Sequence, residues 1–220
     1  MTLIAYKGDS KLKIRFVKEI EKHRKMDAIE QRTYGHQNGK WKGCAVACSL
    51  RSLAIMDGEP LVERYDNHAD YETKLGIPEW LARLEDTIFE GLPVEDAKLW
   101  PTAFAKAIPV GANLDPVKWK FCAFILKENI ERVLKLDIAD DLKEQVVKAV
   151  QGVLAVHDKA IVTGEWDESA AASAASAWSA AESAARSAES AARSARSAAY
   201  ITYSKELLRL LKAVAQSKYT

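Results

Sequence analysis

The chain has 220 residues, enough for one large domain or two small ones with a sizeable core. Lysine and arginine total 32 against 31 aspartates and glutamates, and the formal charge of +1 argues against a dedicated duplex-DNA binder. No stretch approaches the roughly 20 apolar residues of a membrane span, and MTLIAYKGDSKLK lacks the apolar run of a secretory signal. Three cysteines are too few for a disulfide framework, so we expect a soluble protein of the reducing cytoplasm.

The first part of the chain predicts two helices joined by a glycine-rich loop. Residues 10–30 are typical of a helix with Asp9 or Ser10 as its N-cap, preceded by a TLIAY segment that could form a lone strand. The second helix is expected from about Cys44 to Met56, where Asp57 and Gly58 stop it. It is apolar almost all round, which predicts that it is buried.

The middle of the chain adds further helices. In GIPEWLARLEDTIFEGLP, Pro78 marks a helix start and Gly91 lies just past its end. Helical pieces follow in WPTAFAKAIP, DPVKWKFCAFILKENIERVLKL and ADDLKEQVVKAVQGVLAVHDKAIVTG. No succession of alternating strand patterns appears, so the predicted fold is an all-α helical bundle forming a single domain over residues 1–220.

The stretch 167–200 is rich in alanine and serine and has strict internal order. Its serines from 169 to 197 advance 28 residues in eight steps, a mean of 3.5, which is the coiled-coil period. Because alanine favours helix, we predict one continuous helix over most of 168–198. It would be either a rigid scaffold beside the helical core of residues 1–165 or a homo-oligomer seam. Residues 166–216 would then hold this helix and a helical tail.

Four segments together resemble a family of uncharacterised proteins from bacteria and their phages: AYKGD, KGCAVACSL, YETKLGIPEWLARLEDTIFEGLP and WPTAFAKAI. Members of that family carry glycine where this chain has Ala47, and a histidine soon after the second cysteine. Here that stretch is SLRSLAIMDGE, so His68 is the next candidate. The resemblance implies that these blocks form one unit, and its phage association favours a host-interaction or defence-related role.

Some polar residues are predicted on buried helix faces. His23 and Asp27 share one arc with Phe16 and Ile20. Glu85 falls among Leu81, Leu84, Ile88 and Leu92, whereas Asp86 and Glu90 are expected to point the other way. A buried carboxylate needs a partner, so we expect Glu85 to pair with His23 or Asp27. This network either fixes helix register or forms a ligand site.

The stretch GKWKGCAVACSLRSL predicts an anion site at the start of the second helix. The free N–H groups and dipole of a helix N-terminus favour an anion and equally favour a thiolate at Cys44. Lysines and an arginine would add positive charge, and the glycines would let the backbone approach a ligand. The predicted ligand-binding residues are Tyr34, Lys40, Lys42, Gly43, Cys44, Arg51 and His68.

Three hypotheses follow for the function. The first is a non-enzymatic protein that binds a small, nucleotide-like anion. The second is a cysteine-dependent hydrolase or transferase in which Cys44 is the nucleophile, His23 or His68 the base, and Asp27 or Glu85 the orienting group. The third is a helical scaffold that binds a partner. We predict no cofactor and no structural zinc site, because Cys44 and Cys48 lack a second pair at ligand spacing; His23, Asp27, His68 and Glu85 could hold a divalent ion.

Overall fold

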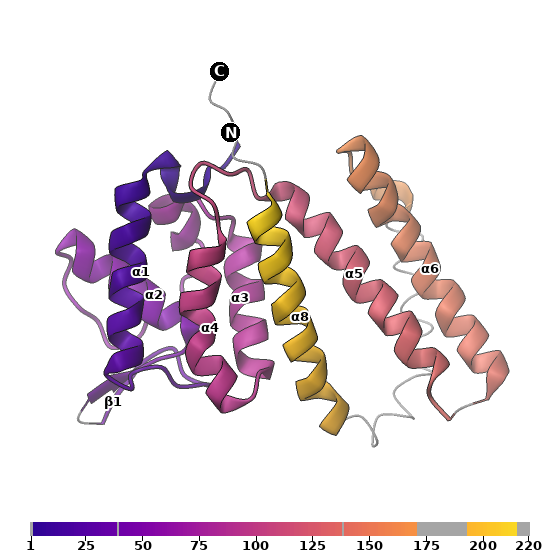
Figure 1. The fold of residues 1–220 in the computed structure, drawn as a ribbon, viewed down its shortest axis with the longest axis horizontal. Helices are drawn as coiled ribbons and strands as arrows, with labels where there is room; N and C mark the ends of the chain where they lie inside the picture. The colour runs from indigo at the N-terminus through magenta and orange to yellow at the C-terminus, as the bar shows by residue number, and fades with distance from the viewer. Residues whose placement is uncertain (1, 39, 138, 171–192, 215–220) are drawn as a thin grey trace. The chain divides into compact units, whose positions relative to one another are not determined.

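A computed structural model describes residues 2–38, 40–137, 139–170 and 193–214 (Figure 1). The all-α prediction is confirmed. The helices are α1 (Ser10–Lys25), α2 (Ala45–Asp57), α3 (Glu79–Gly91), α4 (Val94–Ala107), α5 (Asp115–Leu134), α6 (Asp140–Thr163) and α8 (Arg193–Ala213), with short helical turns η1 (Ala5–Gly8) and η2 (Tyr71–Leu75). Strand structure in the described residues is a small antiparallel pair, β1 (His36–Asn38) with β2 (Lys40–Lys42), in which His36 lies opposite Lys42.

Contacts divide the chain into two compact units, and the single domain expected over residues 1–220 stays a prediction. Unit 1 is Met1–Asp115 together with Ser197–Thr220, and unit 2 is Pro116–Arg196. Unit 1 is therefore discontinuous in sequence, since its last helix follows the whole of unit 2. Most of the Ala/Ser-rich stretch, residues 171–192, lies outside the described residues, so the predicted continuous helix over 168–198 stays a prediction.

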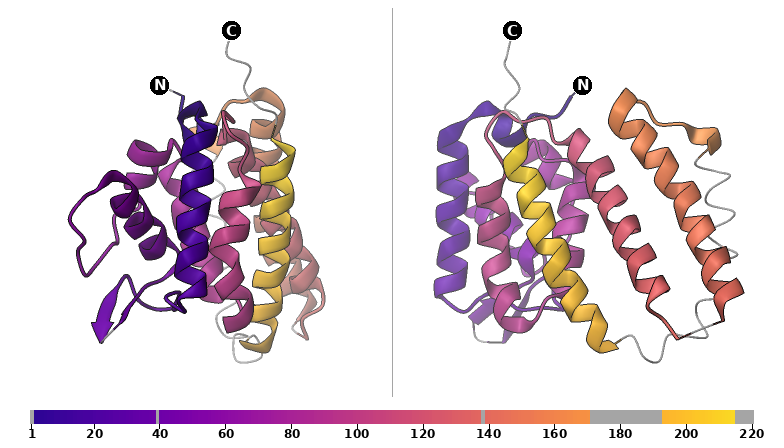
Figure 2. Two further views of the ribbon diagram at one scale, coloured as in Figure 1. Left: turned by 60° about the vertical axis from the view of Figure 1, so that its left-hand side comes forward. Right: turned by 45° about the vertical axis from the view of Figure 1, so that its right-hand side comes forward.

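The core of unit 1 lies between α1, α2, α3 and α4. Its fully buried large side chains include Phe16, Leu53, Leu81, Phe89 and Phe104. Helix α8 lies against the α3–α4 pair (Figures 1 and 2) and buries Leu207, Leu210 and Leu211. At the end of α3, the ring of Tyr200 occupies the space that a Cβ on Gly91 would need.

Several helix ends follow the predicted signals. The side chain of Asp9 caps α1 by accepting a hydrogen bond from the Lys11 amide, and Pro78 is the N-cap of α3. Helix α2 ends at Gly58, whose φ of 69° is the left-handed conformation that favours glycine. The expectation that the TLIAY segment could form a strand is wrong. It leads into η1, where Tyr6 and Lys7 adopt left-handed backbone angles.

Helix α1 is shorter than predicted, because it ends at Lys25 instead of residue 30. The backbone of Ala28 accepts a hydrogen bond from Gly43, and Glu30 donates one to the Gly43 carbonyl. These bonds to a distant segment replace the helical ones, and Asp27 adopts a φ of 53° at the turn. The sequence pattern predicted that Asp27 lies on the same buried arc as His23. This prediction is wrong, because Asp27 lies beyond the end of the helix.

Unit 2 contains the antiparallel pair α5 and α6. Leu126 of α5 packs with Val146 and Val150 of α6 in a small apolar core. Trp119 stacks on Trp166 with 4.8 Å between ring centroids, and His157 lies against both rings. None of the described helices in either unit has the length and apolar character needed to cross a membrane.

Candidate functional site

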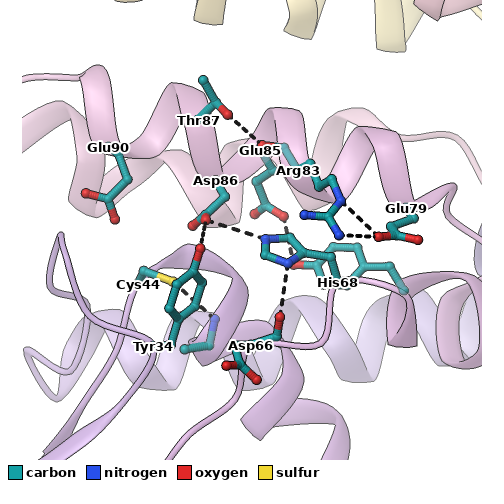
Figure 3. Close-up of polar contacts among 12 residues, drawn as sticks. Tyr34, Cys44, Asp66, His68, Glu79, Arg83, Glu85, Asp86, Thr87 and Glu90 are labelled. Carbon is teal, nitrogen blue, oxygen red and sulfur yellow. Dashed lines mark hydrogen bonds and ion pairs between the residues drawn. The ribbon is translucent and has the colours of Figure 1, made fainter.

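Helix α3 presents two carboxylates, Asp86 and Glu90, on one face (Figure 3). They are four residues apart, which places them one above the other on the helix surface. Asp86 is 8% exposed and Glu90 is partly exposed. The expectation that these residues point away from the interior is wrong for Asp86, because the loops carrying Tyr34 and His68 cover this second face of the helix.

The Asp86 carboxylate is held from two directions. The Tyr34 hydroxyl donates a hydrogen bond of 2.7 Å to Oδ2, and the His68 Nε2 atom lies 3.4 Å from the same oxygen (Figure 3). The other oxygen, Oδ1, is buried and has no partner within hydrogen-bond distance among the described residues, although the neighbouring Cys44 thiol interacts with the Asp86 carboxylate. A buried carboxylate oxygen without a hydrogen bond destabilises the folded protein unless a cation or a hydrogen-bond donor lies beside it.

The ring of His68 is oriented by the backbone. Its Nδ1 atom lies 3.1 Å from the carbonyl oxygen of Asp66, which can only accept, so this contact is a hydrogen bond when Nδ1 carries the proton. In the neutral ring, Nε2 is then an acceptor that faces the Asp86 carboxylate. In that tautomer two acceptors lie 3.4 Å apart, an arrangement that a metal ion bound beside them would stabilise.

Cys44 lies on the other side of Asp86, at the N-cap of α2. Its Sγ atom accepts a hydrogen bond from the Ala47 amide at 3.5 Å, and the residue is 1% exposed. Burial raises the pKa of the Cys44 thiol above its ordinary value, and the negative charge of Asp86 raises it further. The thiol is therefore protonated at neutral pH, which is the opposite of an activated nucleophile.

Three ligand-type atoms meet at this point. The Sγ atom of Cys44 and one carboxylate oxygen each from Asp86 and Glu90 lie within 4.8 Å of one another. Glu90 is also tied to the loop above it, because both of its oxygens accept the Arg32 amide proton at 2.9 Å. Burial raises the pKa of Glu90. We refer to Tyr34, Cys44, His68, Asp86 and Glu90 as the acidic cluster.

Glu85 is buried as predicted, but its expected partner is wrong. The Tyr71 hydroxyl donates a hydrogen bond of 2.7 Å to Oε2, whereas Oε1 has no partner among the described residues. Burial raises the pKa of Glu85 to about 8, and the neighbouring charge of Asp86 acts in the same direction. Glu85 is thus largely protonated at neutral pH, so it adds little negative charge to the acidic cluster.

The other predicted catalytic residues lie apart from Cys44. His23 packs edge-on against Trp41 with 5.6 Å between ring centroids, and burial lowers its pKa to about 4. Asp27 is exposed and lies 3.8 Å from both Lys42 and Lys98. The structure therefore does not bring His23 or Asp27 together with Cys44 or Glu85.

The predicted anion-binding residues separate into two groups. Tyr34, Cys44 and His68 meet in the acidic cluster. The cations do not join them: Lys40 is exposed on β2, Lys42 lies 3.7 Å from Glu30, and the Arg51 guanidinium lies over the Trp41 ring at 4.6 Å.

Gly43 has a packing role at this point in the chain. A Cβ atom there would lie 2.5 Å from the Trp41 ring. The glycine therefore lets the loop pack closely against an aromatic side chain, and its hydrogen bonds are made to Ala28 and Glu30.

Sequence reasoning missed Asp86 and Glu90. Their spacing of four residues was a visible signal, because it places two carboxylates side by side on one helix face. A single face of α3 was assigned to the core, and the covering loops have no periodic pattern that would mark the second face as buried. Comparisons of the chain with family models, with curated proteins and with solved structures found no match.

Proposed function

We propose that this protein binds a divalent transition-metal ion of the zinc class through Cys44, Asp86 and Glu90. The observation that carries the proposal is the convergence of one sulfur and two carboxylate oxygens within 4.8 Å around a buried aspartate with an unpartnered oxygen. The Nε2 atom of His68 lies 3.4 Å from Asp86 Oδ2 and is a candidate for a fourth ligand, although it lies outside the group of three atoms that are within 4.8 Å of one another. Sulfur, nitrogen and carboxylate oxygen together are the ligand types that Zn²⁺ takes in proteins.

The ligand set favours zinc-like ions over harder ones. Mg²⁺ and Ca²⁺ prefer oxygen ligands alone, whereas a thiolate selects softer metals. A Cys44 thiolate with the Asp86 and Glu90 carboxylates would place three negative charges close together, two of them on buried residues, and a divalent ion would offset most of that charge. Because Cys44 is protonated without the ion, binding should release a proton and become tighter as the pH rises.

The same surroundings weigh against the two ligand-based alternatives. An anion at the start of α2 would face Asp86 and Glu90, while Lys42 is already paired with other carboxylates. A nucleophilic cysteine needs nearby positive charge to form its thiolate, and the charged group beside Cys44 is a carboxylate. A cationic ligand is the chemistry that matches the acidic cluster.

Co²⁺ provides the direct test, because a cobalt–thiolate bond gives a charge-transfer absorption band in the near ultraviolet. Wild-type protein titrated with Co²⁺ should develop this band and lose it when Zn²⁺ is added. Cys44→Ser should abolish the band while keeping a good N-cap for α2. Asp86→Asn should weaken Zn²⁺ binding by at least about ten-fold in calorimetry.

Cys122→Ser is the matched control, since Cys122 lies in unit 2, away from the ligand atoms in the sequence. That variant should keep both the band and the affinity. Folded wild-type protein that gives neither a cobalt–thiolate band nor heat with Zn²⁺ would rule out the proposed function.

A further inference from the structure

Helix α1 has a larger net positive charge than the chain as a whole. Its 16 residues contain seven lysines and arginines against two glutamates, a formal charge of +5, while the complete chain carries +1. The rest of the molecule is therefore net acidic. A charge distribution this uneven creates a local positive potential and steers partners of opposite charge to one element.

The excess is gathered on one exposed face. At about 100° per residue, six residues fall within an arc of about 100° on the helix surface. All six are exposed: Lys11, Ile14, Arg15, Lys18, Lys22 and Lys25. We call this set the basic face. It extends for about 21 Å along the helix at ~1.5 Å per residue.

The lysines along this face differ in whether the protein itself neutralises them. Lys22 pairs with Glu19 at 2.5 Å, and Arg15 donates to the backbone carbonyl of Met56. In contrast, no carboxylate within the described ranges forms an ion pair with Lys11, Lys18 or Lys25. These three cations recur every seven residues and leave a regular row of charge available to another molecule.

An apolar side chain interrupts the row. Ile14 is 66% exposed, the largest exposed fraction among the large hydrophobic residues described in unit 1. It lies between Lys11 and Lys18 on the same face. Exposed apolar groups are common singly, but this one lies among unpaired cations, so a protein partner could cover Ile14 while its carboxylates pair with the lysines at the polar rim of the contact.

We propose that the basic face of α1 is a docking surface for an acidic protein partner that presents an apolar side chain between its carboxylates. Charge complementarity identifies the partner's sign, and Ile14 identifies its class. A phosphate backbone would pair with the lysines and leave Ile14 in water, whereas a protein segment can cover both. An acidic amphipathic helix fits the straight row of about 21 Å.

The test uses the full-length protein and a synthetic peptide probe. The probe is a labelled helical peptide with one stripe of glutamates and a leucine at its centre, and the matched peptide carries serine in place of that leucine. Fluorescence anisotropy at a fixed, near-physiological salt concentration should show binding of the leucine peptide. The serine peptide should bind at least about five-fold more weakly.

Variants separate charge from apolar contact. Lys18→Glu and Ile14→Ser should each weaken binding of the leucine peptide by at least about five-fold. Lys205→Glu, an exposed lysine of α8, is the charge-matched control and should have no effect. Circular dichroism should show that all variants stay folded, since each changed side chain is exposed.

Three results would overturn the proposal. Tighter binding to a DNA duplex or to anionic phospholipid vesicles than to the peptide would make this a phosphate-binding face. If Ile14→Ser binds the leucine peptide with unchanged affinity, the peptide is recognised by its charge alone. An equal loss in Lys205→Glu would show that the effect belongs to net charge and not to α1.

Discussion

Glu85 shows how one buried carboxyl couples protonation to stability. Its folded-state pKa of about 8 lies well above the ordinary value of 4.5. Between these two pH values the folded protein keeps a proton that the unfolded chain releases, so stability falls as the pH rises. The contribution of protonated Glu85 to the free energy of unfolding is fully present below about pH 4.5, and it is lost as the pH rises through about 8.

We therefore predict that Glu85→Gln removes much of the pH dependence between pH 5 and 8. The amide can still accept the Tyr71 hydrogen bond, and it has no charge to desolvate. Urea unfolding should give a variant that is more stable than wild type at pH 8 by on the order of 1–3 kcal/mol, with a smaller difference at pH 5. Glu79→Gln, at a partly exposed position of the same helix, should keep the wild-type slope. A wild-type slope in Glu85→Gln would mean that Glu85 is already ionised in the folded protein.

Residue identity was easier to predict than residue partnership. The apolar periodicity of α3 marked Glu85 as buried, and its 1% exposure agrees. Its partner Tyr71 comes from η2, a single turn whose sequence has no helical periodicity to reveal its position. The acidic cluster was predicted only in part for the same reason. Tyr34, Cys44 and His68 were named as site residues from the sequence, but their proximity to Asp86 and Glu90 of α3 depends on tertiary contacts.

Gly91 and Gly152 are helical glycines in opposite surroundings. A Cβ at Gly91, in the last turn of α3, would lie 2.2 Å from the Tyr200 ring, whereas a Cβ at Gly152 in α6 would meet nothing within 4 Å. Gly91→Ala should therefore lower the free energy of unfolding by about 1–3 kcal/mol through overpacking. Gly152→Ala should raise it by about 0.5–1 kcal/mol through helix propensity.

Thermal unfolding of the two alanine variants provides the measurement. Tyr200→Ala combined with Gly91→Ala should recover part of the Gly91→Ala loss, because the ring that clashes is gone. Destabilisation of similar size in both single variants would indicate that helix geometry, and not the contact with Tyr200, sets the effect.

The starts of α1 and α3 were predicted well because they depend on local signals, whereas α4 begins at Val94, six residues before the predicted segment WPTAFAKAIP. Asp9 and Pro78 act within a few residues of the positions that they mark. The end of α1 was wrong because it depends on the pairing of residues 28–30 with Gly43, which no local pattern announces. Tertiary hydrogen bonds of this kind override helix propensity, and here they moved Asp27 from the predicted site to the surface.

The whole molecule was predicted as one domain because its helices follow one another without an obvious linker. The division at Asp115 and Ser197 reflects which helices contact each other, and that information is not periodic in the sequence. A consequence is testable by removing the last segment. A chain ending at Arg196 lacks Tyr200, Leu207, Leu210 and Leu211, and each buried leucine contributes about 1.5–3 kcal/mol.

Hydrogen exchange of this truncated chain should therefore show a large loss of protection in α1–α4. Helices α5 and α6 should lose much less, because their shared core of Leu126, Val146 and Val150 lies within unit 2. The full-length protein is the reference for each helix. Equal losses in α1–α4 and in α5–α6 would show that the two units unfold together.

The discontinuity of unit 1 also sets an order of events during synthesis. Helices α1 to α4 leave the ribosome first, but the leucines of α8 that complete their core follow only after all of unit 2 has been translated. At about 5–20 residues per second, that interval is on the order of ten seconds. During that time the nascent chain exposes the apolar surface of α3 and α4 that α8 later covers. A chaperone, or another unfolded chain in the first step of aggregation, would bind at this surface.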